Sequence, residues 1–192
     1  IYSIITLRLY KIMAININLK KSANINNIKN FVLFCNKSYN FEGLEGHSFK
    51  NKFKDIKNLI NSIEKNKSND ILLLNINPFQ KVIIIKIEES NLSLDNEKKG
   101  DKFLDFIKKN GLNSLTFLES NILKQNKKKF EINEFIHGLK LKFYNFNKYK
   151  SNKKIQKIDL DILILENKIK INKKLESLIE GINFTKELVS EP

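Results

Sequence analysis

Arginine is almost absent from this chain of 192 residues, in which Arg8 is the only arginine among 35 basic side chains. Arginine is the side chain that proteins favour for two-point contacts with phosphate groups and guanine bases. Its scarcity argues against a dedicated nucleic-acid reader, although the formal net charge is +14. The excess of lysine comes with abundant Asn, Ile and Phe, as an AT-rich genome would produce. We therefore interpret the charge as a generally basic surface.

Cysteine and long apolar segments are scarce as well. Cys35 is the only cysteine, which excludes a disulfide within the chain and favours a reducing, cytoplasmic setting. The apolar runs 71–74 and 82–85 are far shorter than the ~20 residues that a helix needs to span a bilayer. No membrane partner is therefore expected.

Methionine occurs once, at Met13. The residues before it, 1–12, contain an apolar stretch that Arg8 interrupts, and they lack the small-residue cleavage site of a signal peptide. We predict that translation begins at Met13 and that residues 1–12 are an upstream extension of the reading frame.

From Met13 onward, strand-like and helix-like patterns alternate. Short β-branched or alternating runs predict strands, and apolar residues spaced three and four apart predict helices. The expected strands are 14–19, 30–35, 71–75, 82–87, 114–118 and 158–165. The expected helices are 49–63, 103–107, 130–143 and 175–188, and Asn110-Gly111 closes the second of them. This alternation is typical of a three-layer α/β domain.

The pattern also suggests how the chain is divided. Segment 158–165 has apolar side chains on both faces, which indicates a strand inside a sheet that helices cover. We expect residues 13–166 to form the α/β domain and residues 167–192 to form a linker and a connecting helix. The order of the strands does not follow from the sequence.

Few residues suggest chemistry. The two histidines, His47 and His137, are far apart in the sequence and have no Cys or acidic cluster at ligand spacing, so we expect structural or surface roles. Asp159 and Asp161 share one face of the last expected strand and could act as paired carboxylates. We favour the alternative that they decorate the entry of a strand that is buried further on.

The remaining candidates are weaker. Gly43-Leu44-Glu45-Gly46 lacks the spacing and the strand-to-helix context of a phosphate loop. Cys35 has no basic or histidine neighbour in sequence and is expected to be a buried thiol at a strand end. No nucleophile, base and orienting group come together, so we assign no catalytic, cofactor-binding or metal residue, and we expect the chain to be non-catalytic.

Two segments resemble the leucyl (cytosol) aminopeptidase family in order and spacing. The first is Glu-Phe-Ile-His-Gly-Leu at 134–139 with Tyr-Asn-Phe-Asn-Lys-Tyr-Lys at 144–150. The second runs from Glu-Gly-Ile-Asn at 180–183 to Leu-Val-Ser-Glu-Pro at 188–192. It is similar to the family sequence that opens the catalytic domain, with Lys186-Glu187 in place of Arg-Asp and Ser190 in place of Asn. Glycines at 138 and 181 inside helices also predict close packing against a neighbour.

The resemblance implies a macro-domain-like, mostly parallel mixed sheet that forms the amino-terminal domain of a cytoplasmic exopeptidase. The parent enzyme would release amino-terminal residues from peptides with two divalent metals, zinc or manganese, that activate a water. The family's metal ligands lie in a catalytic domain that would follow residue 192. The implied partners are this catalytic domain and the other subunits of a homo-hexamer, so the domain would serve assembly.

Two alternatives remain open. One is a basic module that binds nucleic acid through lysine-rich segments 124–129 and 148–157, with affinity that falls steeply as salt rises. The other is a macro-like domain that binds ADP-ribose-type ligands, which the missing phosphate loop makes the less favoured of the two.

Overall fold

The computed structural model describes residues 14–44, 54, 56, 58–59, 70–87, 93–126, 130–143 and 157–190. The described elements are β1 (Ala14–Lys20), η2 (Ile25–Asn27), β2 (Asn30–Cys35), β3 (Ile71–Asn77), β4 (Gln80–Lys86), α3 (Ser93–Lys109), β5 (Ser114–Leu118), α4 (Glu119–Asn126), α5 (Ile132–Phe143), β6 (Lys157–Leu163) and α6 (Lys173–Ser190). The predicted extension 1–12, most of the expected helix 49–63 and the family-like run 144–150 lie outside the described residues.

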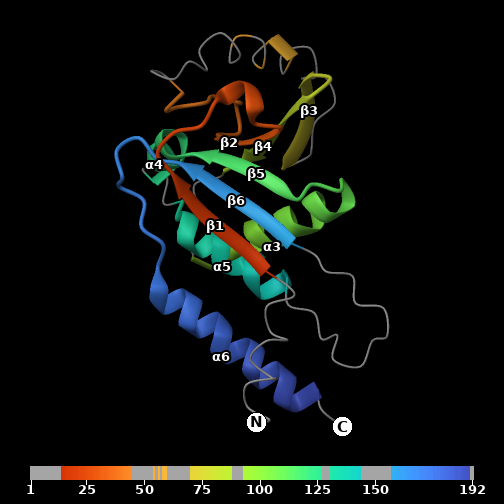
Figure 1. Cartoon of the computed structure of the whole chain (residues 1–192), viewed down its shortest axis with the longest axis vertical. Coiled ribbons are helices and arrows are strands. Elements are labelled where there is room, and N and C mark those ends of the chain that lie inside the picture. Colours follow the sequence, from red (N-terminus) through yellow and green to blue (C-terminus); the bar gives the residue numbers. More distant parts are fainter. Residues whose placement is uncertain are drawn as a thin grey trace.

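The six strands form one sheet in the order β1-β6-β5-β2-β4-β3. Every neighbouring pair is parallel except β3 with β4, which are antiparallel and joined by the turn at Pro78 and Phe79. Figure 1 shows α3 and α5 together against one side of this sheet. The expected mixed, mostly parallel α/β fold is therefore confirmed.

The sheet is covered differently on its two faces. Phenylalanine rings from β2, β5, α3, α5 and the loop before α5 pack against one another on the first face. They are Phe34, Phe103, Phe117, Phe130 and Phe135. On the second face, Phe31, Leu33 and Ile84 pack with Leu44 and Ile56 from the segment between β2 and β3. Strands β2 and β4 are buried on both faces, which explains their nearly continuous apolar sequence.

Two glycines allow α3 and α5 to approach closely. A Cβ at Gly100 would lie 1.9 Å from the carbonyl oxygen of Phe135, and one at Gly138 would lie 2.0 Å from that of Glu97. The expected close packing at Gly138 is therefore confirmed. At Gly181, by contrast, no atom of the described residues lies within 4 Å of the position of a Cβ, so the described part of the chain gives this glycine no close neighbour.

Helix α4 was not expected from the sequence. Its buried residues include Glu119, Asn121 and Gln125, and these polar side chains hide the apolar periodicity that marks a helix. The expectation for β6 also needs correction. This strand lies inside the sheet, between β1 and β5, as expected, but it is not buried on both faces. Asp159 and Asp161 lie on one face, and both are partly exposed.

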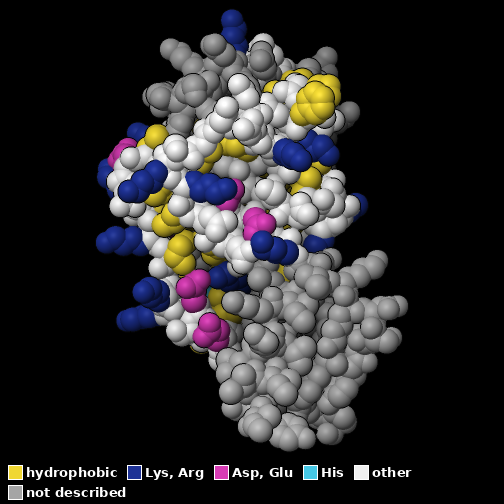
Figure 2. Space-filling model, in the orientation of Figure 1, with side chains coloured by type: hydrophobic (Ala, Val, Ile, Leu, Met, Phe, Trp, Pro, Cys, Tyr) yellow, Lys and Arg dark blue, Asp and Glu magenta, His cyan; other side chains and the backbone are white. Residues whose placement is uncertain are grey.

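Helix α6 extends beyond the sheet at one end of the molecule (Figure 1). Ile179 is buried near α5, whereas Leu178, Phe184 and Leu188 are 50%, 59% and 58% exposed. No helix in the described part of the chain has the length and apolar character needed to cross a membrane. The side of the molecule seen in Figure 2 carries scattered lysines with several acidic side chains between them, as a generally basic surface would.

Candidate functional site

The natural place to look for a ligand site is the boundary between β5 and β2. After β5 the chain goes on to β6, on the side of the sheet that also holds β1. After β2 it goes on to β3 and β4, on the other side. In open α/β sheets, ligands bind at such a switch point, outside the carboxyl ends of the strands. Here α4 begins at Glu119, directly after β5 ends at Leu118.

The side chains of α4 hold the neighbouring strand end and loop. The amide of Asn121 accepts a hydrogen bond from the Phe34 N–H at 2.8 Å and donates to the Phe34 and Glu42 carbonyls at 3.1 and 2.8 Å. The Ser120 hydroxyl donates to the Gly43 carbonyl. Gly43 has φ +77, and a Cβ there would lie 2.2 Å from the backbone carbonyl oxygen of Ser120, so only glycine fits. The loop after β2 is thus fastened to α4.

Glu119 does the same for the loop after β6. Its Oε2 accepts hydrogen bonds from the backbone N–H groups of Leu165, Glu166 and Asn167 at 2.6, 2.7 and 3.2 Å. Its Oε1 accepts from those of Lys168 and Ile169 at 2.7 and 3.0 Å. Successive N–H groups that converge in this way form a nest that suits an anion.

The N–H groups of the nest keep the Glu119 carboxylate ionised, although Glu119 is fully buried. Burial by itself would raise the pKa of Glu119, but the backbone N–H groups of residues 165, 166, 168 and 169 outweigh it and keep the pKa below the ordinary value of 4.5. Glu119 is therefore ionised at neutral pH. The Glu119 carboxylate therefore occupies the position that an anionic ligand would take in this nest.

These contacts leave little scope for a ligand between β5 and β2. The loops after β2 and β6 are both tied to α4, and the Glu42 and Gly43 carbonyls and the N–H groups of residues 165–169 already have partners. The Gly43–Gly46 segment, which the sequence did not favour as a phosphate loop, meets α4 through Gly43, and Leu44 is buried in the core. Glu45 and Gly46 lie outside the described residues.

The histidines are not brought together. His47 lies outside the described residues, and His137 is buried in α5 with its Nδ1 2.9 Å from Glu97 Oε1. Its Nε2 has no hydrogen-bond partner in the described structure. His137 lines a cavity of about 10 Å³ between α5 and the first turns of α6, which is too small for more than about one water. A structural role fits this position.

Asp159 and Asp161 share one face of the sheet as expected, but side chains of β1 engage both. Asn16 donates to Asp159 at 2.7 Å, Asn18 donates to Asp161 at 2.9 Å, and the Lys20 ammonium lies 2.6 Å from Asp161. Carboxylates that accept such bonds stabilise the pairing of the two strands. The geometry supports the structural interpretation over paired catalytic carboxylates.

Cys35 is fully buried at the end of β2, as expected, and forms no disulfide. Across the described ranges, no three His, Cys, Asp or Glu side chains gather closely enough to hold a metal ion. Sequence reasoning missed Glu119 and Asn121. The only signal for them is that Glu-Ser-Asn follows directly on the strand 114–118, where a polar loop would otherwise be read.

The comparisons with known proteins support the fold. No protein-family model and no curated protein sequence matches the chain. A tomato leucine aminopeptidase variant superimposes with a TM-score of 0.62 at 18% identity, over 93% of this chain and 39% of that one. The macro domain of ganglioside induced differentiation associated protein 2 superimposes with a TM-score of 0.53 at 12% identity, over 88% of this chain and 84% of that one. The chain thus spans about two fifths of the tomato enzyme, and the likeness to both structures shows a macro-like α/β fold.

Proposed function

We propose that this chain is the non-catalytic amino-terminal domain of a leucyl aminopeptidase, a two-metal exopeptidase that releases amino-terminal residues from peptides. The observation that carries the proposal is the structural likeness to a leucine aminopeptidase over 93% of this chain. The order of the two family-like sequence segments supports it independently, because 134–139 falls on α5 and 180–188 falls on α6.

The form of α6 agrees with a connecting role. Its first turns are fixed to α5 by an ion pair of 2.9 Å between Lys140 and Glu176 and by the burial of Ile179. Beyond them Phe184 and Leu188 are more than half exposed, and Val189 is 82% exposed. Apolar side chains gathered on the last turns of a helix mark a contact surface. In this proposal residues 167–192 lead to a catalytic domain and the exposed end of α6 packs on it.

The rest of the proposal concerns assembly. The parent would be a cytoplasmic homo-hexamer with two zinc or manganese ions in each catalytic domain, and this domain would contribute to subunit contacts. The coding sequence on the far side of the Pro192 codon tests the proposal. We expect it to continue in frame into a domain with a cluster of Asp, Glu and Lys suited to two metals. A continuation into a domain without metal ligands would refute the proposal.

A macro-type ligand site is the second candidate, because a macro domain superimposes over most of this chain. The contacts of Glu119 and Asn121 favour the first proposal, since they occupy the edge where a ligand of an open α/β sheet would bind. Calorimetry with ADP-ribose separates the two. Saturable binding of ADP-ribose would favour the macro-type function.

Nucleic-acid binding stays a prediction of the sequence. Of its two lysine-rich segments, the structure describes 124–126 and Lys157. A filter-binding assay with single-stranded RNA over a range of salt concentrations tests it, and the absence of binding at low salt would exclude it.

A further inference from the structure

A hollow lined by lysines lies at the carboxyl edge of the sheet, beside β4 rather than between β5 and β2. Lys86 ends β4, and Asp70 precedes β3, which starts at this edge because it runs antiparallel to β4. The Lys86 N–H donates to the Asp70 carbonyl at 2.9 Å, which fixes the two backbones together. The hollow has a volume of about 190 Å³, and its lining residues are Asp70, Lys86, Asp95, Lys98, Lys99 and Lys102.

The cations of this hollow are only partly neutralised. Lys102 lies 3.3 Å from the Asp70 carboxylate, so one acidic group is already engaged. The Lys86 ammonium lies 4.6 Å from the centroid of the Tyr39 ring, a cation–π contact that orients it, and it makes no ion pair among the described residues. Lys98 and Lys99 make no ion pair within the ranges that the structure describes. The four lysines and two aspartates of the described lining have a net charge of +2.

Convergence on a hollow distinguishes these lysines from the others. Elsewhere Lys20, Lys140 and Lys168 each pair with a single carboxylate. Here several ammonium groups face a common volume, and their mutual repulsion falls when an anion enters. A lysine ammonium offers three donors and no acceptor, which suits the oxygens of a phosphate group.

We propose that this hollow binds a small phosphate-type polyanion, such as orthophosphate, diphosphate or a phosphomonoester. Its volume lies below the roughly 300–1,000 Å³ of pockets that hold drug-sized ligands, which favours a small ion over a dinucleotide. The site is independent of the aminopeptidase proposal, because it uses no residue of α4 or α6.

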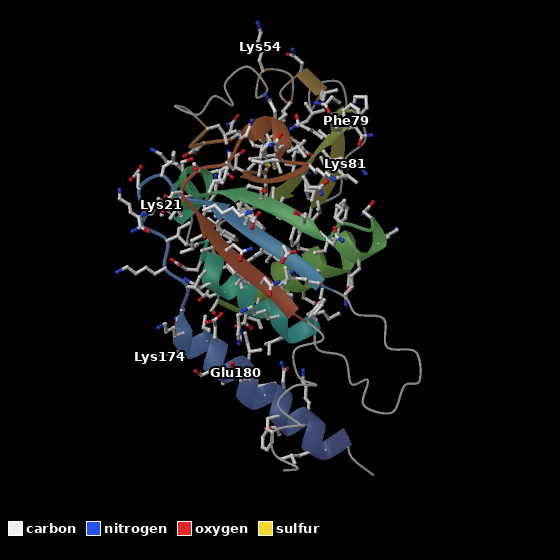
Figure 3. All side chains as sticks on the ribbon, viewed as in Figure 1. Lys21, Lys54, Phe79, Lys81, Lys174 and Glu180 are labelled. Atoms are coloured by element: carbon white, nitrogen blue, oxygen red, sulfur yellow. The ribbon has the colours of Figure 1, made fainter. Side chains whose placement is uncertain are left out.

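Calorimetric titration of the 192-residue protein with inorganic pyrophosphate tests this site. The test variant is Lys98→Ala with Lys99→Ala. The matched control is Lys173→Ala with Lys174→Ala, an adjacent pair on α6 that removes the same charge; Figure 3 shows Lys174 near the start of that helix. We expect the test variant to bind about tenfold more weakly than the unsubstituted protein and the control to bind within about twofold of it.

Three results would overturn the proposal. The first is an absence of measurable pyrophosphate binding at low ionic strength. The second is an equal loss of affinity in both double variants, which would mean that pyrophosphate senses only the general charge of the protein. The third is citrate binding as tightly as pyrophosphate, which would show a site for any polyanion rather than for phosphate. Far-ultraviolet circular dichroism of each variant checks that it is folded, so that affinities are compared between folded proteins.

Discussion

Removing the charge of Glu119 while keeping its shape should destabilise the domain strongly. In the Glu119→Gln variant, one oxygen still accepts two or three of the five backbone hydrogen bonds, but an NH₂ group faces the remaining N–H donors. A hydrogen bond to a charged group contributes ~1.5–3 kcal/mol, and residues 165–168 are exposed enough for water to recover part of this. We expect a loss of about 2–4 kcal/mol in the free energy of unfolding.

Urea unfolding followed by circular dichroism measures this loss. The matched control is Glu166→Gln in the same loop, where the side chain is exposed and pairs with Lys168, so we expect a change within about 0.5 kcal/mol. The Glu119→Ala variant should lose somewhat more, about 3–5 kcal/mol, because all five donors lose their acceptor. A Glu119→Gln variant as stable as the Glu166→Gln control would refute the reasoning.

The same residue predicts a pH dependence. The pKa of Glu119 is lowered in the folded state, so its stabilising contribution is complete above the pKa of the unfolded chain, which is about 4.3. The contribution falls as pH drops through the folded pKa. The difference in stability between the unsubstituted protein and Glu119→Gln should therefore be constant from pH 7 to about 5 and shrink below about 4. A difference that stays constant down to pH 2 would contradict this.

Four further substitutions have expected outcomes by thermal unfolding or light scattering. Gly138→Ala should destabilise the domain by about 1–3 kcal/mol, because the added Cβ would meet the α3 backbone. Gly181→Ala should stabilise it by about 0.5–1 kcal/mol, because no described atom lies near the added Cβ and alanine favours a helix. Equal effects of the two substitutions would contradict the packing account. Gln125→Met should stabilise by about 1 kcal/mol, since the fully buried amide has no partner in the described structure. Leu188→Glu should reduce any self-association seen by light scattering, and an unchanged mass would exclude α6 as its cause.

Periodicity in the sequence predicts most of the sheet. The runs at 30–35 and 114–118 match β2 and β5 residue for residue, because buried parallel strands need continuous apolar side chains. Helix α3 starts ten residues before the apolar cluster that predicted it. Its first turns carry Asp95, Asn96 and Lys98, and only the later turns face the core with large side chains. Periodicity marks the part of a helix that packs and says little about the rest.

The contacts that Glu119 and Asn121 of α4 make with the neighbouring loops could not be predicted from the sequence. Glu119 and Asn121 look like surface residues in the sequence, and their burial depends on backbone groups that lie 46–50 and 79–87 positions away. Such long-range partners leave no local pattern. The lysine hollow was missed as well, since its lysines come from two different elements, Lys86 from β4 and Lys98 from α3, and no sequence pattern links them. The sequence did predict, through Gly138, where two helices approach each other closely.

The most direct test of the central claim uses the full product of the gene that encodes this chain. Hydrolysis of leucine p-nitroanilide is measured with added manganese or zinc, and the mass in solution is measured by light scattering, for the full product and for a version without residues 1–192. The proposed function predicts metal-dependent hydrolysis by the full product and a smaller assembly when this domain is removed. A full product without metal-dependent peptidase activity would contradict it.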